Sequence, residues 1–164
     1  MDPSTGKEIE ATINDSTSSD DDSNSLQGKR VALYFAAGWC PMCTRAFEPS
    51  LATFRKARDA SDQPVELVYV SSDRDAASAQ RRASQLQMKM VPFGDESAKI
   101  KAKYQIWAGS EAMTFRLGGR RSGVPALVVL DKTGNELAFL PAEAQGPQAL
   151  ESWPMDDEMG IWGS

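Results

Sequence analysis

The sequence contains no histidine and only two cysteines among its 164 residues. The absence of histidine removes the most common metal ligand and excludes a nucleophilic serine–histidine pair. A structural zinc site normally needs four cysteine or histidine ligands, so a complete site in one chain would have to recruit carboxylates. We also find no phosphate-binding glycine loop and no carboxylate dyad. We therefore expect neither a metal nor a bound cofactor.

Long apolar runs and an excess of positive charge are absent as well. No apolar run approaches the roughly 20 residues that span a bilayer, and the first residues, MDPSTGKEIE, lack the features of a secretory signal. The net charge of -5 argues against binding to a phosphate backbone. We expect a monomer in the cytoplasm, with the nucleus as the alternative compartment, and neither a membrane nor a nucleic acid as partner.

One domain of ordinary size is the natural expectation for 164 residues of which 41% are hydrophobic. Residues 1–27 are dominated by Ser, Thr, Asp and Asn and are predicted to form a disordered acidic leader, because they cannot bury enough apolar surface to fold. Either an inert extension or a solubilising, phosphorylatable tail fits this composition. The folded domain is predicted over residues 28–154, and residues 155–164 are predicted to be a C-terminal tail.

Strand and helix patterns alternate along the predicted domain. Apolar runs predict four strands, at residues 30–36, 65–70, 126–130 and 136–140. Helical spacing predicts four helices, at residues 40–60, 74–88, 96–104 and 148–153. Asp73 and Asp95 are the expected N-caps of the second and third helices. Residues 107–123 show neither period and predict an inserted loop, with a hairpin as one form of it. The βαβα order predicts an α/β fold whose sheet begins parallel, and the last two strands predict an antiparallel hairpin.

Both cysteines lie in the stretch LYFAAGWCPMCTRAF, where a buried strand leads directly into a helix. Only a thiolate attacks a disulfide, and the unpaired N–H groups and dipole at this turn favour the ionised form of Cys40. Cys43 lies one turn further along the same helix face, within reach of Cys40 and more deeply buried. This asymmetry predicts that Cys40 attacks a disulfide and that Cys43 resolves the mixed disulfide. Pro41 suits an early helical position, where its missing N–H has no intrahelical partner.

Around these cysteines the sequence resembles the thioredoxin-like oxidoreductases, and within them the nucleoredoxin and tryparedoxin branch. YFAAGWCPMC is similar to the branch's YF-x-A-x-WCPPC, VYVSSDRD resembles its strand and Ser-Asp turn, and VPFGDESAKIKAKYQI with SGVPALVVLD resembles its remaining half. The likeness extends over about residues 28–153. It implies a thioredoxin-like fold: a central mixed β-sheet flanked by helices, with an inserted loop before the cis-proline strand.

The resemblance also implies the roles of individual residues. Cys40 is the nucleophile and Cys43 the resolving cysteine of a redox-active disulfide. The implied substrate-binding residues are Trp39, Pro41, Met42, Val124 and Pro125. Trp39 matches a tryptophan that packs beside the active site. Pro125 matches the family's cis-proline, and Val124 before it offers backbone hydrogen bonds to an incoming peptide.

The sequence departs from the family in four places. Met42 replaces the second proline of the motif, which leaves the redox potential open. Tyr34 stands where ordinary thioredoxins have a buried acid, as it does in the tryparedoxin branch, and leaves no obvious carboxylate to take the Cys43 proton. Pro49 falls one residue later than the family's helix-kinking proline, so either the kink shifts or the first turn is rearranged.

The fourth departure is the insertion at residues 107–121, which precedes the Val124–Pro125 loop. Its arginines, Arg116, Arg120 and Arg121, either act on the site or are solvated on a surface loop. At the site they would recognise an acidic partner or favour the Cys40 thiolate.

We therefore expect a protein-disulfide reductase that acts by dithiol–disulfide exchange. Its partners are disulfide-containing client proteins and a thiol reductant or reductase that the sequence does not identify. A structural disulfide is not favoured, because so short a loop adds little stability. Three alternatives stay open: a redox-sensing binding module with little turnover, a metal or iron–sulfur module bridged between chains by the cysteines, and an inert packed pair.

Overall fold

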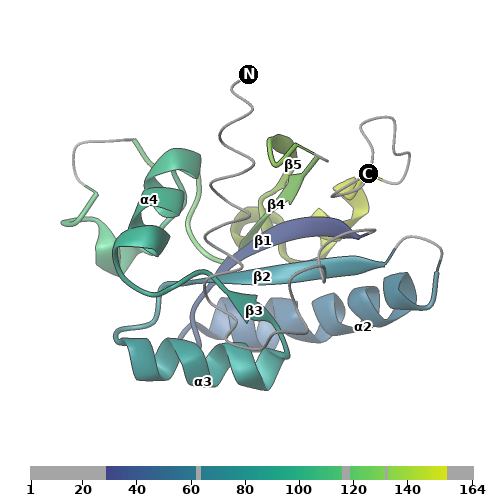
Figure 1. The fold of residues 1–164 in the computed structure, drawn as a ribbon, viewed down its shortest axis with the longest axis horizontal. Helices are drawn as coiled ribbons and strands as arrows, with labels where there is room; N and C mark the ends of the chain where they lie inside the picture. Colours follow the sequence, from purple (N-terminus) through teal and green to yellow (C-terminus); the bar gives the residue numbers. More distant parts are fainter. Residues whose placement is uncertain (1–28, 62–63, 116–118, 132, 155–164) are drawn as a thin grey trace.

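A computed structural model of the chain describes residues 29–61, 64–115, 119–131 and 133–154 (Figure 1). The predicted leader and tail lie outside these residues, and so does Arg116. The domain boundaries proposed from the sequence therefore stay predictions.

Within the described residues, five strands form one mixed sheet in the order β3-β2-β1-β4-β5. The strands are β1 (Arg30–Ala36), β2 (Val65–Ser71), β3 (Lys89–Met90), β4 (Ala126–Leu130) and β5 (Glu136–Leu140). β1 pairs in parallel with β2 and antiparallel with β4, and β4 and β5 form the predicted antiparallel hairpin. The four predicted strands are confirmed. β3 has two residues, too few to give a periodic signal, and was not predicted.

The core lies on both faces of the central strands, because every residue of β1, β2 and β4 is buried. Successive side chains of a strand point to opposite faces. Tyr34 accordingly packs against Phe47 and Tyr69 on one face, while Phe35 packs edge-on against Tyr104 on the other.

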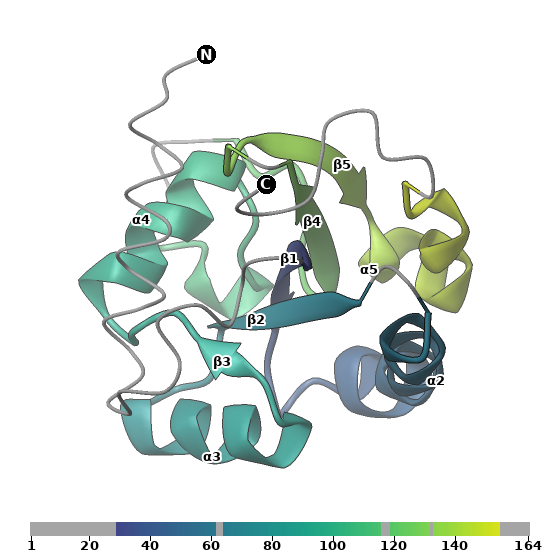
Figure 2. The ribbon, with the colours of Figure 1, turned by 45° about the vertical axis from the view of Figure 1, so that its right-hand side comes forward.

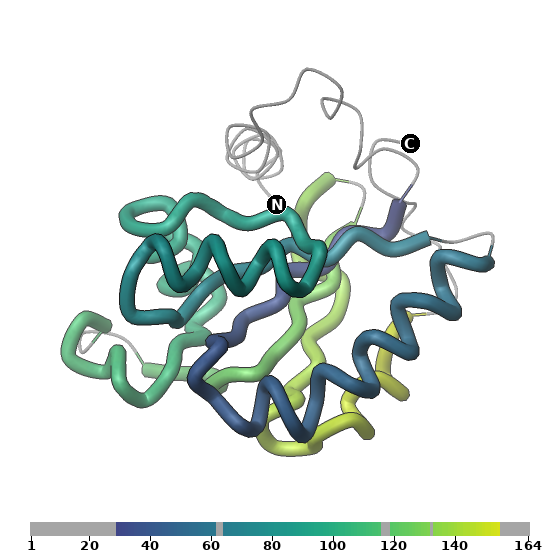
Figure 3. The backbone as a smooth tube through the Cα atoms, turned by 90° about the horizontal axis from the view of Figure 1, so that it is seen from below, coloured from purple at the N-terminus to yellow at the C-terminus, as the bar shows by residue number. Residues whose placement is uncertain are grey.

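Helices cover both faces of the sheet (Figures 1 and 2). α2 (Glu48–Asp59) and α3 (Ala76–Leu86) lie on one face, as expected for two successive right-handed crossovers between parallel strands. α4 (Asp95–Tyr104) covers the other face. The predicted closing helix is instead a short α5 (Ala142–Gln145) followed by the 3-10 helix η3 (Gly146–Ser152), which lies beside α2 (Figure 3).

Both predicted N-caps are wrong. α3 begins after Asp75, whose carboxylate accepts a hydrogen bond from the Ser78 N–H at 2.7 Å. Asp73 does not cap the helix, because its oxygens accept hydrogen bonds from residues outside α3. α4 begins one residue earlier than predicted, so Asp95 is its first residue and Gly94 is its N-cap.

The predicted helix over residues 40–60 is divided near Pro49. Its first part is the π-helix η1 (Met42–Phe47), and its second part is α2. The wide turn closes where the Glu48 N–H donates to the Cys43 carbonyl, five residues back. Pro49 then falls in the first turn of α2, where a missing N–H costs nothing. The first turn is therefore rearranged. The π-helix accommodates the position of Pro49, one residue later than the family's proline.

The insertion is compact in its described part. A single 3-10 turn, η2 (Gly109–Glu111), follows Trp107, and Phe115 stacks on the Trp107 ring at 4.8 Å between centroids. An isolated bridge joins Ile106 to Ser122 at its base. The described part of the insertion contains no hairpin.

Candidate active site

Three segments meet at one end of the central sheet. Ala36, the last residue of β1, pairs with Ser71, the last residue of β2. Phe35 pairs with Ala126, the first residue of the antiparallel strand β4. The turn after β1, the turn after β2 and the Val124–Pro125 segment before β4 therefore lie at the same edge of the sheet. This is the edge at which the cysteines emerge.

Cys40 stands at the start of the helical segment. Its carbonyl accepts hydrogen bonds from the N–H groups of Cys43 and Thr44, each at 3.0 Å. Both cysteines are free thiols. Cys40 is 6% exposed and Cys43 is 0% exposed, so the predicted difference in burial is confirmed, although Cys40 presents only a small surface. The catalytic roles assigned to the two cysteines stay predictions.

The environment of Cys43 favours its protonated form. Burial raises the pKa of the Cys43 thiol, and the neighbouring Cys40 raises it further. The Ala37 backbone N–H and the Arg82 guanidinium lower the pKa of Cys43, but burial is the larger effect. Cys43 is thus held as a thiol and needs a base before it can attack a disulfide.

Exposed side chains surround the nearly covered Cys40. Trp39 is 42% exposed and Met42 is 44% exposed, and Pro41 between the cysteines is exposed as well. The Trp39 indole N–H donates to the Ser72 carbonyl at 2.9 Å, which fixes the ring at the end of β2. An apolar surface held in this way beside a thiol is suited to contact with a polypeptide segment.

The loop before β4 completes this edge. Val124 and Pro125 are buried, and the peptide bond between them is cis, as the resemblance implied. The Pro125 carbonyl accepts a hydrogen bond from the Glu143 N–H at 2.7 Å, which connects the loop to α5. The role of the Val124 backbone in binding a peptide stays a prediction.

Asp73 is a structural residue of the site whose role the sequence did not reveal. Its Oδ1 accepts from the Gly38 N–H at 2.8 Å, and its Oδ2 accepts from the Tyr69 and Ser71 hydroxyls at 2.6 and 2.8 Å. A Cβ at Gly38 would lie 3.3 Å from both Asp73 Oδ1 and the Arg82 side chain, so a glycine allows the close approach. The Ser-Asp turn was visible in the sequence, but its partner 35 residues earlier was not.

The insertion is tied to the same edge through Glu111. Its Oε1 accepts from the Ser72 hydroxyl at 2.5 Å and from the Ala108 N–H at 3.0 Å. Its Oε2 pairs at 2.5 Å with Lys101, whose side chain is buried. Because the Ser72 carbonyl holds Trp39, the insertion supports the residue that positions the exposed indole.

Contacts within the insertion and with β5 engage the two described arginines of the insertion. Arg120 donates to the Trp107 carbonyl at 3.2 Å. Arg121 forms two hydrogen bonds with Glu136 and lies over the Phe139 ring. These contacts account for both guanidinium groups without a role at Cys40. Recognition of an acidic partner by them stays a prediction.

The structure contains a buried carboxylate, Glu48, one helical turn after Cys43, although the sequence indicated no carboxylate that could take the Cys43 proton. The Tyr34 hydroxyl donates to Glu48 Oε2 at 2.9 Å, and Arg82 forms an ion pair with the other oxygen. Glu48 is only 8% exposed. Glu48 directly follows the wide turn of η1, a feature that helical periodicity does not predict.

The described residues contain no group of three or more His, Cys, Asp or Glu side chains that could hold a metal ion. None of their helices is long and apolar enough to cross a membrane.

A mixed sheet with a CxxC pair at a strand-to-helix turn, beside a cis-proline at the same sheet edge, defines a thioredoxin-like protein. A family model described as thioredoxin-like matches residues 28–136. The chain belongs to this family and is of the nucleoredoxin and tryparedoxin type. The nucleoredoxin and tryparedoxin relatives are thiol–disulfide oxidoreductases.

The sequence relatives are nucleoredoxins. The chain is 32% identical over 133 residues to probable nucleoredoxin 1 of Arabidopsis thaliana, covering 81% of this chain and 20% of the relative. It is 33% identical over 113 residues to nucleoredoxin of Mus musculus, covering 69% of this chain and 23% of the relative. The chain thus spans about a fifth of the length of these relatives.

Two solved structures are matched over most of their length. Thioredoxin from Wuchereria bancrofti has a TM-score of 0.55 and 34% identity, with 80% of this chain and 85% of that chain covered. Tryparedoxin I from Leishmania major has a TM-score of 0.56 and 26% identity, with 82% of this chain and 85% of that chain covered.

Proposed function

We propose that this domain is a protein-disulfide reductase in which Cys40 attacks the client disulfide and Cys43 resolves the intermediate. The observation that carries the proposal is the arrangement of the two thiols. Cys40 reaches the surface beside the exposed Trp39 and Met42, while Cys43 is fully covered one turn behind it. Only Cys40 is thus accessible to a client, and only Cys43 is placed to displace the client from Cys40.

The reaction consists of two exchanges. The Cys40 thiolate attacks one client sulfur, forms a mixed disulfide, and releases the other client sulfur as a thiolate that takes up a proton. Cys43 then loses its proton and attacks the Cys40 sulfur. The Cys40–Cys43 disulfide forms, the second client sulfur leaves as a thiolate, and it too is protonated. A thiol reductant restores the two thiols of the domain by the reverse exchanges.

The client is proposed to be a protein segment that lies across the cysteine edge in an extended conformation. Trp39, Pro41 and Met42 would provide its apolar contacts, and the Val124 backbone would hydrogen-bond to it. Such binding would combine side-chain contacts with main-chain hydrogen bonds, as in the recognition of other extended peptides. We place the domain in the cytoplasm or the nucleus, where thiols are kept reduced, and expect it to act as a monomer.

Variants of the two cysteines test the assignment. With insulin as the disulfide substrate and dithiothreitol as the reductant, Cys40→Ser is expected to abolish turnover, whereas Cys43→Ser is expected to accumulate a mixed disulfide detectable by mass spectrometry. Met113→Ser, at an exposed position outside the CxxC motif, is the matched control and should keep full activity. Turnover that survives Cys40→Ser contradicts the proposal. Partner binding that changes with oxidation, without turnover in the wild type, would favour the sensor alternative.

A further inference from the structure

The proton of Cys43 needs a route out of the protein. The side chain is completely covered, and burial raises the pKa of its thiol, so bulk water does not readily take the proton. Resolution of a mixed disulfide nevertheless requires the thiolate. A protein group near Cys43 must therefore accept the proton in the second exchange.

We propose that Glu48 accepts the Cys43 proton through the Tyr34 hydroxyl and releases it into the cleft between α2 and α3. This inference rests on the proposed reductase function and adds the proton acceptor for its second step.

The helix and the sheet bring the three residues together. The Glu48 N–H donates to the carbonyl of Cys43 itself, so the two residues lie one wide turn apart. The Glu48 side chain accepts the hydrogen bond of Tyr34, which comes from β1. The Tyr34 ring packs against Phe47, which is buried with Cys43 on the inner side of η1. Tyr34 thus lies against the helical turn that carries both the thiol and the carboxylate.

Tyr34 relays a proton and does not hold a negative charge. Burial raises the pKa of Tyr34, and the charge of a Cys43 thiolate raises it further. In the relay, the S–H bond of Cys43 breaks and its proton joins the Tyr34 oxygen, while the original Tyr34 proton moves to Glu48 Oε2. Tyr34 ends neutral, Glu48 ends as a carboxylic acid, and Cys43 ends as the thiolate that attacks Cys40. The relay moves no electrons.

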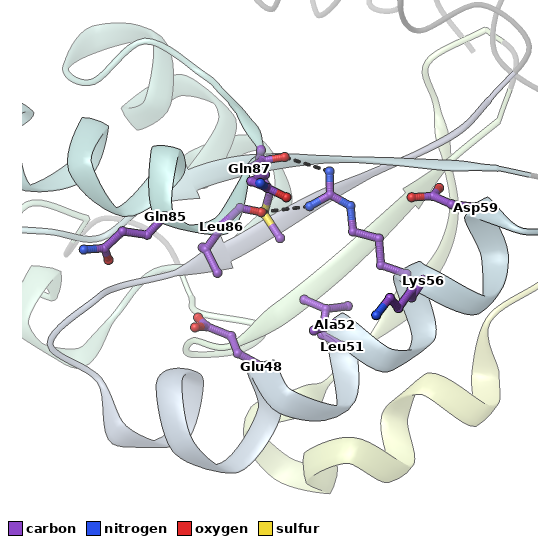
Figure 4. A pocket seen from close by; sticks show the side chains of 10 residues that line it. Glu48, Leu51, Ala52, Lys56, Asp59, Gln85, Leu86 and Gln87 are labelled. Atoms are coloured by element: carbon purple, nitrogen blue, oxygen red, sulfur yellow. Dashed lines mark hydrogen bonds between the residues drawn. The ribbon is translucent and has the colours of Figure 1, made fainter.

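Glu48 also has access to solvent. It lines an open cleft of about 440 Å³ between α2 and the end of α3, together with Leu51 and Met88. Figure 4 shows the Glu48 side chain projecting from α2 toward the side of the cleft where Gln85 and Leu86 lie. A proton received from Tyr34 can be passed to water there, which returns Glu48 to its carboxylate form.

Charged and titratable groups from several elements surround this route. Those that act on Cys43 or Tyr34 are Cys40, Tyr69 and Arg82, and those that share the cleft with Glu48 are Arg55, Lys56 and Asp59. Arg82 pairs with Glu48 Oε1 and leaves Oε2 to the Tyr34 hydroxyl. The pair therefore orients the carboxylate toward the relay.

Stopped-flow reaction of the reduced protein with dithiobis(nitrobenzoate) separates the two exchanges. Cys40 attack releases a first coloured thiolate, and Cys43 attack releases a second. Glu48→Gln and Tyr34→Phe are each expected to slow the second release by about 10-fold or more, while the first changes by less than about 2-fold. As the pH rises, the rates of the second release in the variants and in the wild type should become more similar, because hydroxide replaces the missing proton acceptor.

Glu66→Gln is the matched control. Glu66 is also 8% exposed and paired with a cation, Lys29, but it lies on β2 away from the cysteines, so both releases should stay unchanged. If Glu48→Gln fails to fold because Arg82 loses its partner, the double variant Glu48→Gln/Arg82→Gln replaces it. The relay is overturned if the second release in the folded variants occurs within about 2-fold of the wild-type rate, or if both releases are slowed equally. Absence of the first release in the wild type overturns the reductase function itself.

Discussion

The Asp73 carboxylate accepts a hydrogen bond from the Gly38 N–H, with 2.8 Å between Oδ1 and the nitrogen, across 35 residues of sequence. It joins the end of β2 to the turn that carries the exposed tryptophan and the first cysteine. The same carboxylate accepts two hydroxyl hydrogen bonds, from Tyr69 and Ser71. Because all three donors converge on one buried acceptor group, the shape of the active-site turn depends on this carboxylate.

The Asp73→Asn variant is expected to lose about 1–3 kcal/mol of unfolding free energy. An amide nitrogen in place of Oδ2 cannot accept hydrogen bonds, so the buried Tyr69 and Ser71 hydroxyls lose their acceptor. Urea unfolding followed by circular dichroism measures the loss.

Asp75→Asn provides the control for this prediction. It makes the same chemical change two residues later, at the exposed N-cap of α3, where asparagine caps a helix as well as aspartate does. Its unfolding midpoint should stay close to that of the wild type. Equal losses in the two variants would show that Asp73 has no special structural role.

Glu111→Gln is expected to lower the free energy of unfolding by about 1–3 kcal/mol. This loss is smaller than that for breaking a completely buried ion pair, because Glu111 is partly exposed. The substitution removes the charge that faces the buried Lys101 but keeps an oxygen for the Ser72 hydroxyl. Glu136→Gln, which breaks the more exposed pair with Arg121, should cost only about 0–1 kcal/mol. Thermal unfolding of both variants checks the prediction, and a larger loss in Glu136→Gln would contradict it.

The domain is expected to lose stability in strongly alkaline solution. Burial raises the pKa values of Tyr34 and Tyr69 above the value of about 10 that they have in the unfolded chain. The folded state therefore keeps protons that the unfolded state releases, and the stability that these groups contribute is lost as the pH rises above about 10. Unfolding free energies between about pH 8 and pH 11 should show a decline that is smaller in Tyr34→Phe than in the wild type. Equal slopes would contradict this account.

The contribution of the α3 cap is expected to disappear in acid. The Ser78 N–H lowers the pKa of Asp75 below its unfolded value of about 3.9. The ionised cap therefore stabilises the folded state above that pH, and its contribution is lost as the pH falls through the lower, folded pKa. The stability difference between wild type and Asp75→Ala should shrink as the pH falls below about 4. A difference that stays constant down to about pH 2 would show that the charge of Asp75 plays no part.

Much of the fold follows from short-range patterns in the sequence. Strands β1, β2, β4 and β5 are continuous or nearly continuous apolar runs, so their positions are predictable to within about one residue. The CxxC pair and the resemblance around it similarly locate the active-site edge. These features depend on neighbours in the sequence or on a motif.

The remaining features depend on contacts between distant segments. The sequence predicts Asp73 as the cap of α3, but in the fold Asp73 accepts a hydrogen bond from the distant Gly38 N–H, and Asp75 caps the helix instead. Glu48 follows a π-helical turn, which has no periodic signature, and its partners Tyr34 and Arg82 come from distant segments. Glu111 is likewise an ordinary loop residue until the fold brings Ser72 to it.

The reduction potential of the Cys40–Cys43 pair tests the central claim most directly. Equilibration in glutathione buffers, with both redox states quantified by mass spectrometry, gives its value. A reversible disulfide with a potential between about -270 and -200 mV is the predicted result, because this range spans the thioredoxins and glutaredoxins that act as reductants. A potential near about -120 mV would identify an oxidant, and the absence of a reversible disulfide would contradict dithiol–disulfide exchange altogether.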